Sequence, residues 1–557
     1  MNTRRKNSLK LILILSILII TIYFPYIING GFGPADDLSF INSITLKSEY
    51  DLSLFNSLSL NSGRFRPVGD LLTNIIFLIF KEDSRAYIVL QLLIWFSSVS
   101  VISFILKYIF EKRVAYIFIL FGCFPCFSTS SFYSPYMISY TLSILFWSLS
   151  LLSLIKYLIY HRIYNYYLCY LLFLISLLTL PLVLPLILIT SFLPIIYNKY
   201  AIKTKDRDKI LFFKFLFPVV FLSLIYLLSK LFITKLYQND GIIYGMNGMD
   251  LKSIFQGFYF IIAIIIEIPI LFISTLNFIF RWETIIIIIF ISLYFNLLRK
   301  LPNNLKIKFY NRTSFNHRMF QLFFISLISC MSIFIISGYP AVTFGHYNKM
   351  MLPAFVLISI IISMIINKII STKYILIPIF ISFTWVSSIN IQLSNFVDSW
   401  DLRVNIFNDC VNKLNTTEIG PNPFLIACVP FFTDNNYNNE EVFWLSWDFQ
   451  SGLQFFGAES ITAFPFSWRS LFDDDKIIIK KNYIIYRFSK FSFDENLWYY
   501  EYDNKTKISK LIKVKNSIQF SNIIDNVKAN KINYHRFISR DKMRTNLKTF
   551  LLKIIDI

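Results

Sequence analysis

The stretch LILILSILIITIYFPYII, residues 11–28, is apolar along its whole length, and similar runs recur as far as residue 389. A helical run of about 18 or more such residues can cross the hydrocarbon core of a bilayer. Hydrophobic residues make up 55% of the chain and aromatic residues 18%, more than soluble domains usually contain. The sequence therefore predicts an all-α polytopic membrane domain with about 10–12 transmembrane helices.

The formal net charge of the chain is +21. Much of the basic excess lies in short connections between apolar runs, which the positive-inside rule explains more simply than binding to nucleic acid. Met1–Lys10 is basic, and no small-residue cleavage site follows the first apolar run. We therefore expect an uncleaved first helix whose basic end is cytoplasmic, with the next loop outside and no nucleic acid as a partner.

Several later segments are shorter or interrupted. Pro67–Phe80 is too short to span and is expected at the outer surface. Val114–Phe127 is expected to cross outward, and Tyr166–Tyr197 to form a hairpin of two short helices around the break PLVLP at 181–185. The Glu-Ile-Pro interruption in Ile254–Phe280 predicts a kinked or re-entrant segment, and the helix count stays open there.

The character of the chain changes at about Gln392, after which Trp, Tyr, Asn and Asp become common and no spanning run remains. We place the membrane domain at residues 1–391 and a C-terminal domain at 392–557, long enough for one soluble domain. The alternating run at 477–488 predicts strands, so an α+β fold is expected. The predicted topology places this domain outside the cytoplasm.

The polar loop at residues 30–70 interrupts this apolar pattern and holds Asp36 and Asp37 just after a Gly/Pro-rich turn. One carboxylate could deprotonate an acceptor hydroxyl as a general base. Alternatively, the pair could hold a divalent cation, Mg²⁺ or Mn²⁺, that neutralises a phosphate leaving group. A structural alternative is that Asp37 only caps a short helix.

Arg64 and Arg66 follow in the element GRFRP at residues 63–67. Guanidinium groups at an outer membrane face suit bidentate phosphate contacts or pairing with the aspartates. Interfacial snorkelling is the alternative.

A second candidate lies in the predicted outer turn at residues 338–349, where His346, Tyr347 and Lys349 come close together in sequence. Such a cluster could bind the monophosphate or diphosphate of a lipid-linked donor. An aromatic and basic interfacial anchor is equally consistent with these residue types.

The elements Ala35-Asp36-Asp37 and Gly63-Arg64-Phe65-Arg66-Pro67 together resemble the first outer loop of the GT-C superfamily of membrane glycosyltransferases. The greatest likeness is to bacterial O-antigen glucosyltransferases of the serotype-converting kind, whose loop runs from an Asp-Asp pair to a Gly-Arg-Pro-like element. This chain departs from that pattern by a Phe-Arg insertion before the proline. The resemblance covers about Lys10 to Arg113.

The resemblance implies a GT-C-like fold and an inverting transfer of a hexose from a polyprenyl-phosphate donor to a glycan or lipid-linked acceptor, as in O-antigen or lipopolysaccharide modification. It implies a multi-pass protein of the bacterial inner membrane whose active site faces the periplasm. Asp36 or Asp37 would be the base, and the Arg and His/Lys groups would hold the donor phosphate. The alternatives are an O-antigen polymerase or ligase, and a polysaccharide transporter or flippase.

Overall fold

The computed structural model describes most of the chain and leaves several connections undescribed. The described residues are 2–33, 37–46, 65–133, 137–201, 208–237, 251–276, 281–301, 311–337, 346–370, 374–430, 443, 446–458, 460–467, 477–486, 489–493, 496–504 and 506–530. By their internal contacts they divide into two compact units. The first unit comprises residues 1–33, 43–398 and 435–440, and the second comprises 34–42, 399–434 and 441–557.

The first unit is helical throughout its described part. Its helices are α1 (Asn2–Asn29), α4 (Pro67–Phe80), α5 (Ser84–Ile109), α6 (Lys112–Gly122), α7 (Ser130–Tyr133), α8 (Ile138–Tyr160), α9 (Ile163–Thr179), η2 (Pro181–Leu186), α10 (Ile187–Ala201), α11 (Asp208–Tyr237), α12 (Leu251–Ile262), η3 (Ala263–Glu267), α13 (Ile268–Thr275), α14 (Trp282–Arg299), α15 (Arg312–Ser329), α16 (Met331–Ser337), η5 (His346–Met351), α17 (Leu352–Ile369) and the first part of α18 (Leu376–Thr416).

Nine helices in the described part are long and apolar enough to cross a membrane. These spans are Lys6–Asn29, Ser84–Ile109, Ile138–Tyr160, Pro181–Tyr200, Phe213–Ile233, Trp282–Arg299, Arg312–Ile335, Lys349–Ile369 and Leu376–Thr416. The chain is a multi-pass helical membrane protein. The described part also contains three shorter apolar helices, Pro67–Phe80, Ile163–Thr179 and Gly257–Ile266, of which Pro67–Phe80 is short as the sequence predicts.

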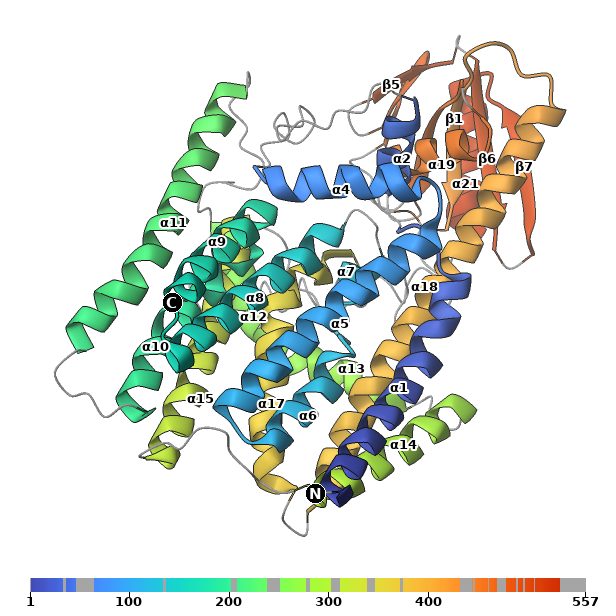
Figure 1. The fold of residues 1–557 in the computed structure, drawn as a ribbon. Coiled ribbons are helices and arrows are strands. Elements are labelled where there is room, and N and C mark those ends of the chain that lie inside the picture. Colours follow the sequence, from blue (N-terminus) through green and yellow to red (C-terminus); the bar gives the residue numbers. More distant parts are fainter. Residues whose placement is uncertain are drawn as a thin grey trace, which may run out of the picture. The chain divides into compact units, whose positions relative to one another are not determined.

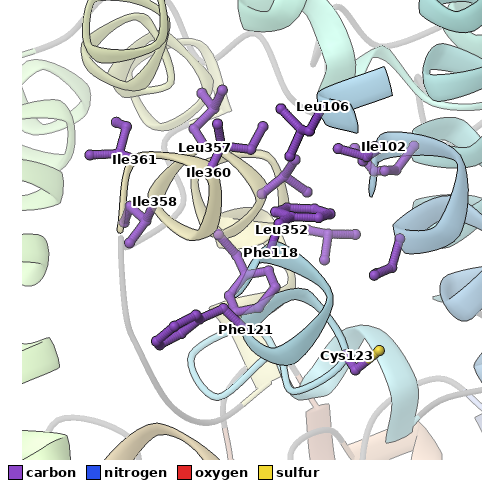
Figure 2. Close-up of a cluster of buried hydrophobic side chains, with 14 of the residues drawn as sticks. Ile102, Leu106, Phe118, Phe121, Cys123, Leu352, Leu357, Ile358, Ile360 and Ile361 are labelled. Carbon is purple, nitrogen blue, oxygen red and sulfur yellow. The ribbon is translucent and has the colours of Figure 1, made fainter. Parts of the chain in front are cut away.

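The core of the first unit is packed by aliphatic and aromatic side chains from α5, α6 and α17. Ile102 and Leu106 of α5 lie near Phe118 of α6 and Leu357 of α17, and all four are at most 1% exposed (Figure 2). Within a bilayer, tight packing of this kind contributes most of the association between helices. It also fixes the positions of the polar ends of the helices.

The short and interrupted segments differ from a regular span in ways that the sequence partly predicts. Helix α4 has the predicted bounds and lies across the ends of α8 and α9 (Figure 1). The predicted Pro181–Pro185 break is the 3₁₀ turn η2 between α9 and α10. The Glu-Ile-Pro interruption lies where the π-helical turn η3 joins α12 to α13.

The segment Val114–Phe127, which the sequence predicts to cross outward, is not one continuous helix, because α6 ends at Gly122. Pro125 has no N–H group, so a helix cannot continue regularly through it. Backbone carbonyls of the buried segment after α6 instead accept side-chain hydrogen bonds: the Oη of Tyr23 donates to Cys123 O at 2.6 Å and the Nε1 of Trp385 to Phe124 O at 2.7 Å. Irregular buried backbone is tolerated when its polar groups are satisfied in this way.

Basic connections that the sequence assigns to one side of the membrane meet at one end of the first unit. The Nζ of Lys112 donates to Ser8 Oγ at 3.0 Å, and the Nε of Arg113 donates to Leu301 O at 2.9 Å. The N-terminal helix and the connections after α5 and α14 therefore share this end. This agrees with the positive-inside rule applied to the basic connections between apolar runs.

The second unit contains a mixed four-stranded sheet of order β2-β1-β6-β7 and an antiparallel three-stranded sheet of order β3-β4-β5. Its elements are α2 (Asp37–Leu46), the last part of α18, β1 (Phe424–Val429), α19 (Ser446–Phe455), β2 (Thr462–Ser467), β3 (Ile477–Ile479), β4 (Tyr483–Tyr486), β5 (Ser489–Ser492), β6 (Leu497–Asp503), β7 (Ile508–Lys513) and α21 (Ser517–Asn530).

Strand β1 lies between β2 and β6 and is parallel to both, with Phe424 opposite Thr462 and Leu497. Its apolar sequence, FLIACV, suits a strand that is covered on both faces. The predicted strands at 477–488 are confirmed by β3 and β4, which pair Ile478 with Ile485. The C-terminal region is therefore a strand region with accompanying helices.

Two features of the domain division differ from the sequence-based boundary. Residue 391 lies inside α18, and the units divide between Asp398 and Ser399. A helix can continue beyond its apolar run when other side chains pack against it there. The last apolar residue therefore does not mark the end of the helix. Residues 34–42 belong to the second unit, although they lie in the first predicted outer loop.

Candidate functional site

The seven sequence-predicted site residues are described to different extents. Asp36 and Arg64 lie outside the described residues. His346 and Tyr347 open the 3₁₀ helix η5, where only their backbone is described. The remaining three, Asp37, Arg66 and Lys349, are described with their side chains, and all three are buried.

Asp37 is the first residue of α2 and is fully buried in the second unit. Leu38 and Ile41 are also buried, which defines the inward face of this helix. On the same face, the Nδ2 of Asn42 donates to the carbonyl of Ser451 in α19 at 2.6 Å. Helix α2 is therefore held against α19, and this contact fixes where the Asp37 carboxylate lies.

Two further charged side chains are buried in the same unit, and both were missed by the sequence reasoning. The Nη2 of Arg403, in α18, lies 2.7 Å from Oδ2 of Asp448, in α19. Arg403 is 1% exposed and Asp448 is fully buried. Both Asp448 and Asp37 are close enough to interact with the charge of Arg403, Asp448 more strongly. We call Asp37, Arg403 and Asp448 the acid–arginine cluster.

Aromatic rings complete the surroundings of the Arg403 guanidinium. Its Cζ lies 5.4 Å from the ring centroid of Trp400, 5.9 Å from that of Phe407 and 5.8 Å from that of Phe443. Trp400, Arg403 and Phe407 follow the i, i+3, i+7 spacing of one helix face. Cations over aromatic faces are attracted to the ring quadrupole, so the rings hold the guanidinium in one orientation.

The cluster contains two carboxylates and one guanidinium. Each carboxylate lies in the first turn of its helix, Asp37 in α2 and Asp448 in α19. The positive end of a helix dipole and a nearby Arg both favour the ionised form of a carboxylate. The cluster therefore places two carboxylates where the charge of Arg403 acts on both of them.

Arg66 belongs to the first unit and has a carboxylate partner that the sequence reasoning did not name. Its Nε lies 2.7 Å from Oδ1 of Asp70, one turn along at the start of α4, and both side chains are 8% exposed. A Cβ placed on Gly69 would lie 2.3 Å from Thr179 O. The absence of a side chain at Gly69 therefore lets this turn approach the end of α9 closely.

Lys349 is also in the first unit and is 7% exposed. Its backbone N–H donates to Ser130 Oγ at 2.8 Å, and its Nζ lies 5.8 Å from the ring centroid of Tyr140, near the start of α8. The Gly69 Cβ position would lie 3.4 Å from the Cβ of Ser139, the neighbour of Tyr140. The Arg66–Asp70 turn and Lys349 therefore both lie at the N-terminal end of α8.

The structure thus distributes the predicted residues over both units, with Asp37 in the second and Arg66 and Lys349 in the first. The divalent cation that the sequence left open would be held by Asp36 and Asp37, and Asp36 lies outside the described residues. Within the described residues, no three His, Cys, Asp or Glu side chains gather as a metal site requires. We therefore derive no step through a metal.

The two cysteines of the Cys-Phe-Pro-Cys segment at residues 123–126 are buried and unpaired with each other. Both thiols are buried after the end of α6, and the structure records no disulfide there. Burial raises the pKa of the Cys123 thiol to about 12 and raises that of Cys126 as well. Raised pKa values keep both groups as unreactive thiols at neutral pH.

A weak sequence signal existed for the two missed residues. Arg403 lies in the segment WDLRVN, directly after the last apolar run, and Asp448 lies in SWDF, beside bulky aromatic residues. Nothing in the sequence links these two segments, which are 45 residues apart, to each other or to Asp37 near the start of the chain. No known protein-family model matches the chain, and no curated protein matches its sequence.

Proposed function

We propose that this chain is a membrane glycosyltransferase that moves a hexose from a polyprenyl-phosphate donor to a cell-surface glycan or lipid-linked acceptor. The observation that carries the proposal is the buried acid–arginine cluster, in which Asp37 opens α2 beside Arg403 and Asp448. Burying two carboxylates and one guanidinium carries a desolvation penalty that lowers stability. We therefore infer that this arrangement serves a function. We assign the reaction to the periplasmic face of a bacterial inner membrane.

In the proposed reaction, Asp37 or its neighbour Asp36 accepts the proton of the acceptor hydroxyl. The acceptor oxygen forms a bond to the anomeric carbon of the hexose from the face opposite the leaving group. The bond between that carbon and the phosphate oxygen breaks, and polyprenyl phosphate leaves with the bonding electrons. Configuration at the anomeric carbon inverts, as expected for a single displacement.

A carboxylate of low basicity can serve as the general base in such a reaction. The transition state of glycosyl transfer resembles an oxocarbenium ion, so the bond to the leaving group is largely broken before the proton moves. Arg403 and Asp448 act as positioning residues, because the ion pair of 2.7 Å fixes Arg403 and Arg403 in turn attracts Asp37.

The leaving phosphate requires cations, since it departs with its charge. From the sequence we assign this role to Arg66 and Lys349, which are both buried in the first unit. Arg64, His346 and Tyr347 extend the assignment from the sequence. Because the leaving group is a lipid phosphate, these cations would act at the level of the lipid headgroups.

The test uses membranes that contain the full chain and a panel of polyprenyl-phosphate hexoses with envelope glycan extracts. Release of polyprenyl phosphate and label transfer to the acceptor are both measured. Asp37→Asn and Asp36→Asn are prepared separately, and we expect at least one to lose about 100-fold or more of the transfer rate. Asp83→Asn is the matched control, because Asp83 also lies at a helix start and caps α5 from an exposed position.

Full transfer by both the Asp36 and Asp37 variants would contradict the proposal. Arg403→Lys and Asp448→Asn add a second criterion. Positioning residues should lower the rate constant of transfer with little effect on the concentration of donor needed for half-maximal rate. Loss of expression in these variants would be separated from loss of activity by quantifying the protein in the same membranes.

A further inference from the structure

The turn between α8 and α9 is a sharply defined end of both helices. His161 adopts the left-handed conformation with φ of 54°, and its N–H donates to the carbonyl of Tyr157 at 2.8 Å. A left-handed residue in this position closes a helix C-terminus, and α9 begins two residues later, at Ile163. The spanning segment of α8 is Ile138–Tyr160. The turn therefore lies just beyond the apolar part of the helix, where lipid headgroups are expected.

Two cations converge on one hydroxyl at this turn. The Nη1 of Arg162 donates to the Oη of Tyr164 at 3.4 Å, and the charges of Arg162 and Lys156 both act on that hydroxyl. Lys156 lies in the last part of α8, before the turn, and its side chain is exposed. A lysine in this position can extend along the helix to bring its ammonium group to the headgroup level. The turn therefore gathers positive charge from both of the helices that it connects.

A third cation, Lys214 of α11, lies beside the same end of α8. Its Nζ donates to the Oη of Tyr157 at 2.6 Å and lies 5.5 Å from the ring centroid of Tyr166 in α9. The ring of Tyr157 is in turn 6.4 Å from that of His161. Helices α8, α9 and α11 thus meet here (Figure 1). Lys214 is held by the tyrosines, whereas Lys156 and Arg162 point their charges at the exposed turn.

The positive charge at this turn is not offset within the described part of the chain. The ion pairs there involve none of Lys156, Arg162 and Lys214. Like charges that act on the same group also repel each other, and an anion in contact with both would relieve that repulsion. Snorkelling explains why a single cation reaches the headgroup level, but not why two share one hydroxyl. The turn therefore suits an anion supplied from outside the protein.

The exposed face of α9 indicates what kind of anion this is. Tyr164, Tyr167, Leu168 and Leu171 are all exposed and follow the i, i+3, i+4, i+7 spacing of one helix face. Tyr167 is 66% exposed and Leu171 is 55% exposed, which is costly in water and favourable against lipid chains. This apolar face begins at Tyr164, where the two cations converge. An anion bound at the turn can therefore continue into an apolar chain along α9, as a lipid does and a soluble anion does not.

We propose that Lys156 and Arg162 bind the phosphodiester of an anionic bilayer phospholipid, such as phosphatidylglycerol, whose acyl chain lies along the exposed face of α9. Tyr164 holds the Arg162 guanidinium at the turn, and its ring lies at the interface between headgroup and chain, where tyrosine is favoured. The site uses none of the residues assigned to the donor phosphate. It does not depend on sugar transfer, so it stands or falls separately from the proposed function.

The test measures the fluorescence anisotropy of phosphatidylglycerol with a labelled acyl chain as it binds the purified full chain in a neutral detergent. The double variant Lys156→Gln with Arg162→Gln should weaken binding by about tenfold or more, as expected on loss of charge-assisted hydrogen bonds. Exchanging the two cations, Lys156→Arg with Arg162→Lys, keeps both charges and should retain most of the affinity. Lys300→Gln with Arg318→Gln is the matched control, because it removes two exposed cations from other helices of the same unit.

Unlabelled competitors identify the ligand. Phosphatidylglycerol should displace the labelled lipid, whereas phosphatidylcholine with the same acyl chains and inorganic phosphate should do so only weakly. Unchanged binding by the Lys156→Gln and Arg162→Gln double variant, or equal weakening by the control pair, would overturn the assignment of a site at this turn. Competition by phosphatidylcholine as strong as by phosphatidylglycerol would exclude an anion-selective site, and competition by inorganic phosphate of equal strength would exclude the lipid. Both cations are exposed, so the variants should fold, and their elution in size-exclusion chromatography verifies this.

Discussion

Replacing Arg403 by Gln tests the energetics of the acid–arginine cluster. The substitution removes the guanidinium whose Nη2 lies 2.7 Å from Oδ2 of Asp448, a fully buried side chain. Removing one partner of a buried ion pair leaves the other charge without compensation and typically costs about 3–5 kcal/mol. The rings of Trp400, Phe407 and Phe443 lose their cation as well.

A double variant separates the charge effect from lost packing. Arg403→Gln combined with Asp448→Asn removes both charges and leaves groups that can hydrogen-bond, so it should cost less than Arg403→Gln alone. With Asp448→Asn alone, these variants complete a double-mutant cycle, and the interaction energy it gives is on the order of 0.5–3 kcal/mol for residues in contact. Asp37 retains its carboxylate in all of these variants, so it does not contribute to this energy directly.

The assay is urea unfolding of the full chain in detergent, followed by tryptophan fluorescence, with the midpoint converted to a free energy by linear extrapolation. Lys510→Gln, an exposed substitution on β7 of the same unit, is the control and should stay within about 0.5 kcal/mol of wild type. An Arg403→Gln protein as stable as that control would refute the reasoning that the cluster is buried and mutually dependent.

Three further outcomes follow from the first unit. Gly69→Ala should destabilise the protein by about 1–3 kcal/mol in thermal unfolding, because its Cβ would meet Thr179 O at 2.3 Å; a neutral result would contradict the close approach of α4. The Cys123 and Cys126 thiols should resist maleimide at pH 7–8 in intact membranes and react after denaturation, since burial raises the pKa of both; rapid native labelling would show that they are accessible. A reporter inserted after Leu301 should report the same side of the membrane as the N-terminus, because Arg113 binds its carbonyl; a report from the opposite side would exclude this arrangement.

The helical part of the fold could be read largely from the sequence, because bilayer thickness imposes the length and apolarity of each span. The same argument identified α4, whose Pro67 start and short apolar run are both local features. Where a helix ends inside the protein, local rules were insufficient. The end of α6 at Gly122 depends on Tyr23 and Trp385, which satisfy the carbonyls beyond it from distant helices.

The candidate site was only partly predictable for the same reason. Asp37 could be identified because a pair of carboxylates beside a membrane span has a high free-energy cost without partners. Its neighbours Arg403 and Asp448 are single charges in separate segments, and only the packing of α2 and α18 with α19 brings them together. Sequence periodicity describes one helix or strand at a time. It therefore does not predict contacts between side chains from separate elements.

The measurement that tests the central claim most directly is sugar transfer by Asp37→Asn and Asp36→Asn in membranes that contain equal amounts of protein. The account predicts that at least one variant loses about 100-fold or more of the rate at which polyprenyl phosphate is released, while binding of polyprenyl phosphate is retained. Full release by both variants, or no release by the wild-type protein from any polyprenyl-phosphate hexose, would contradict it.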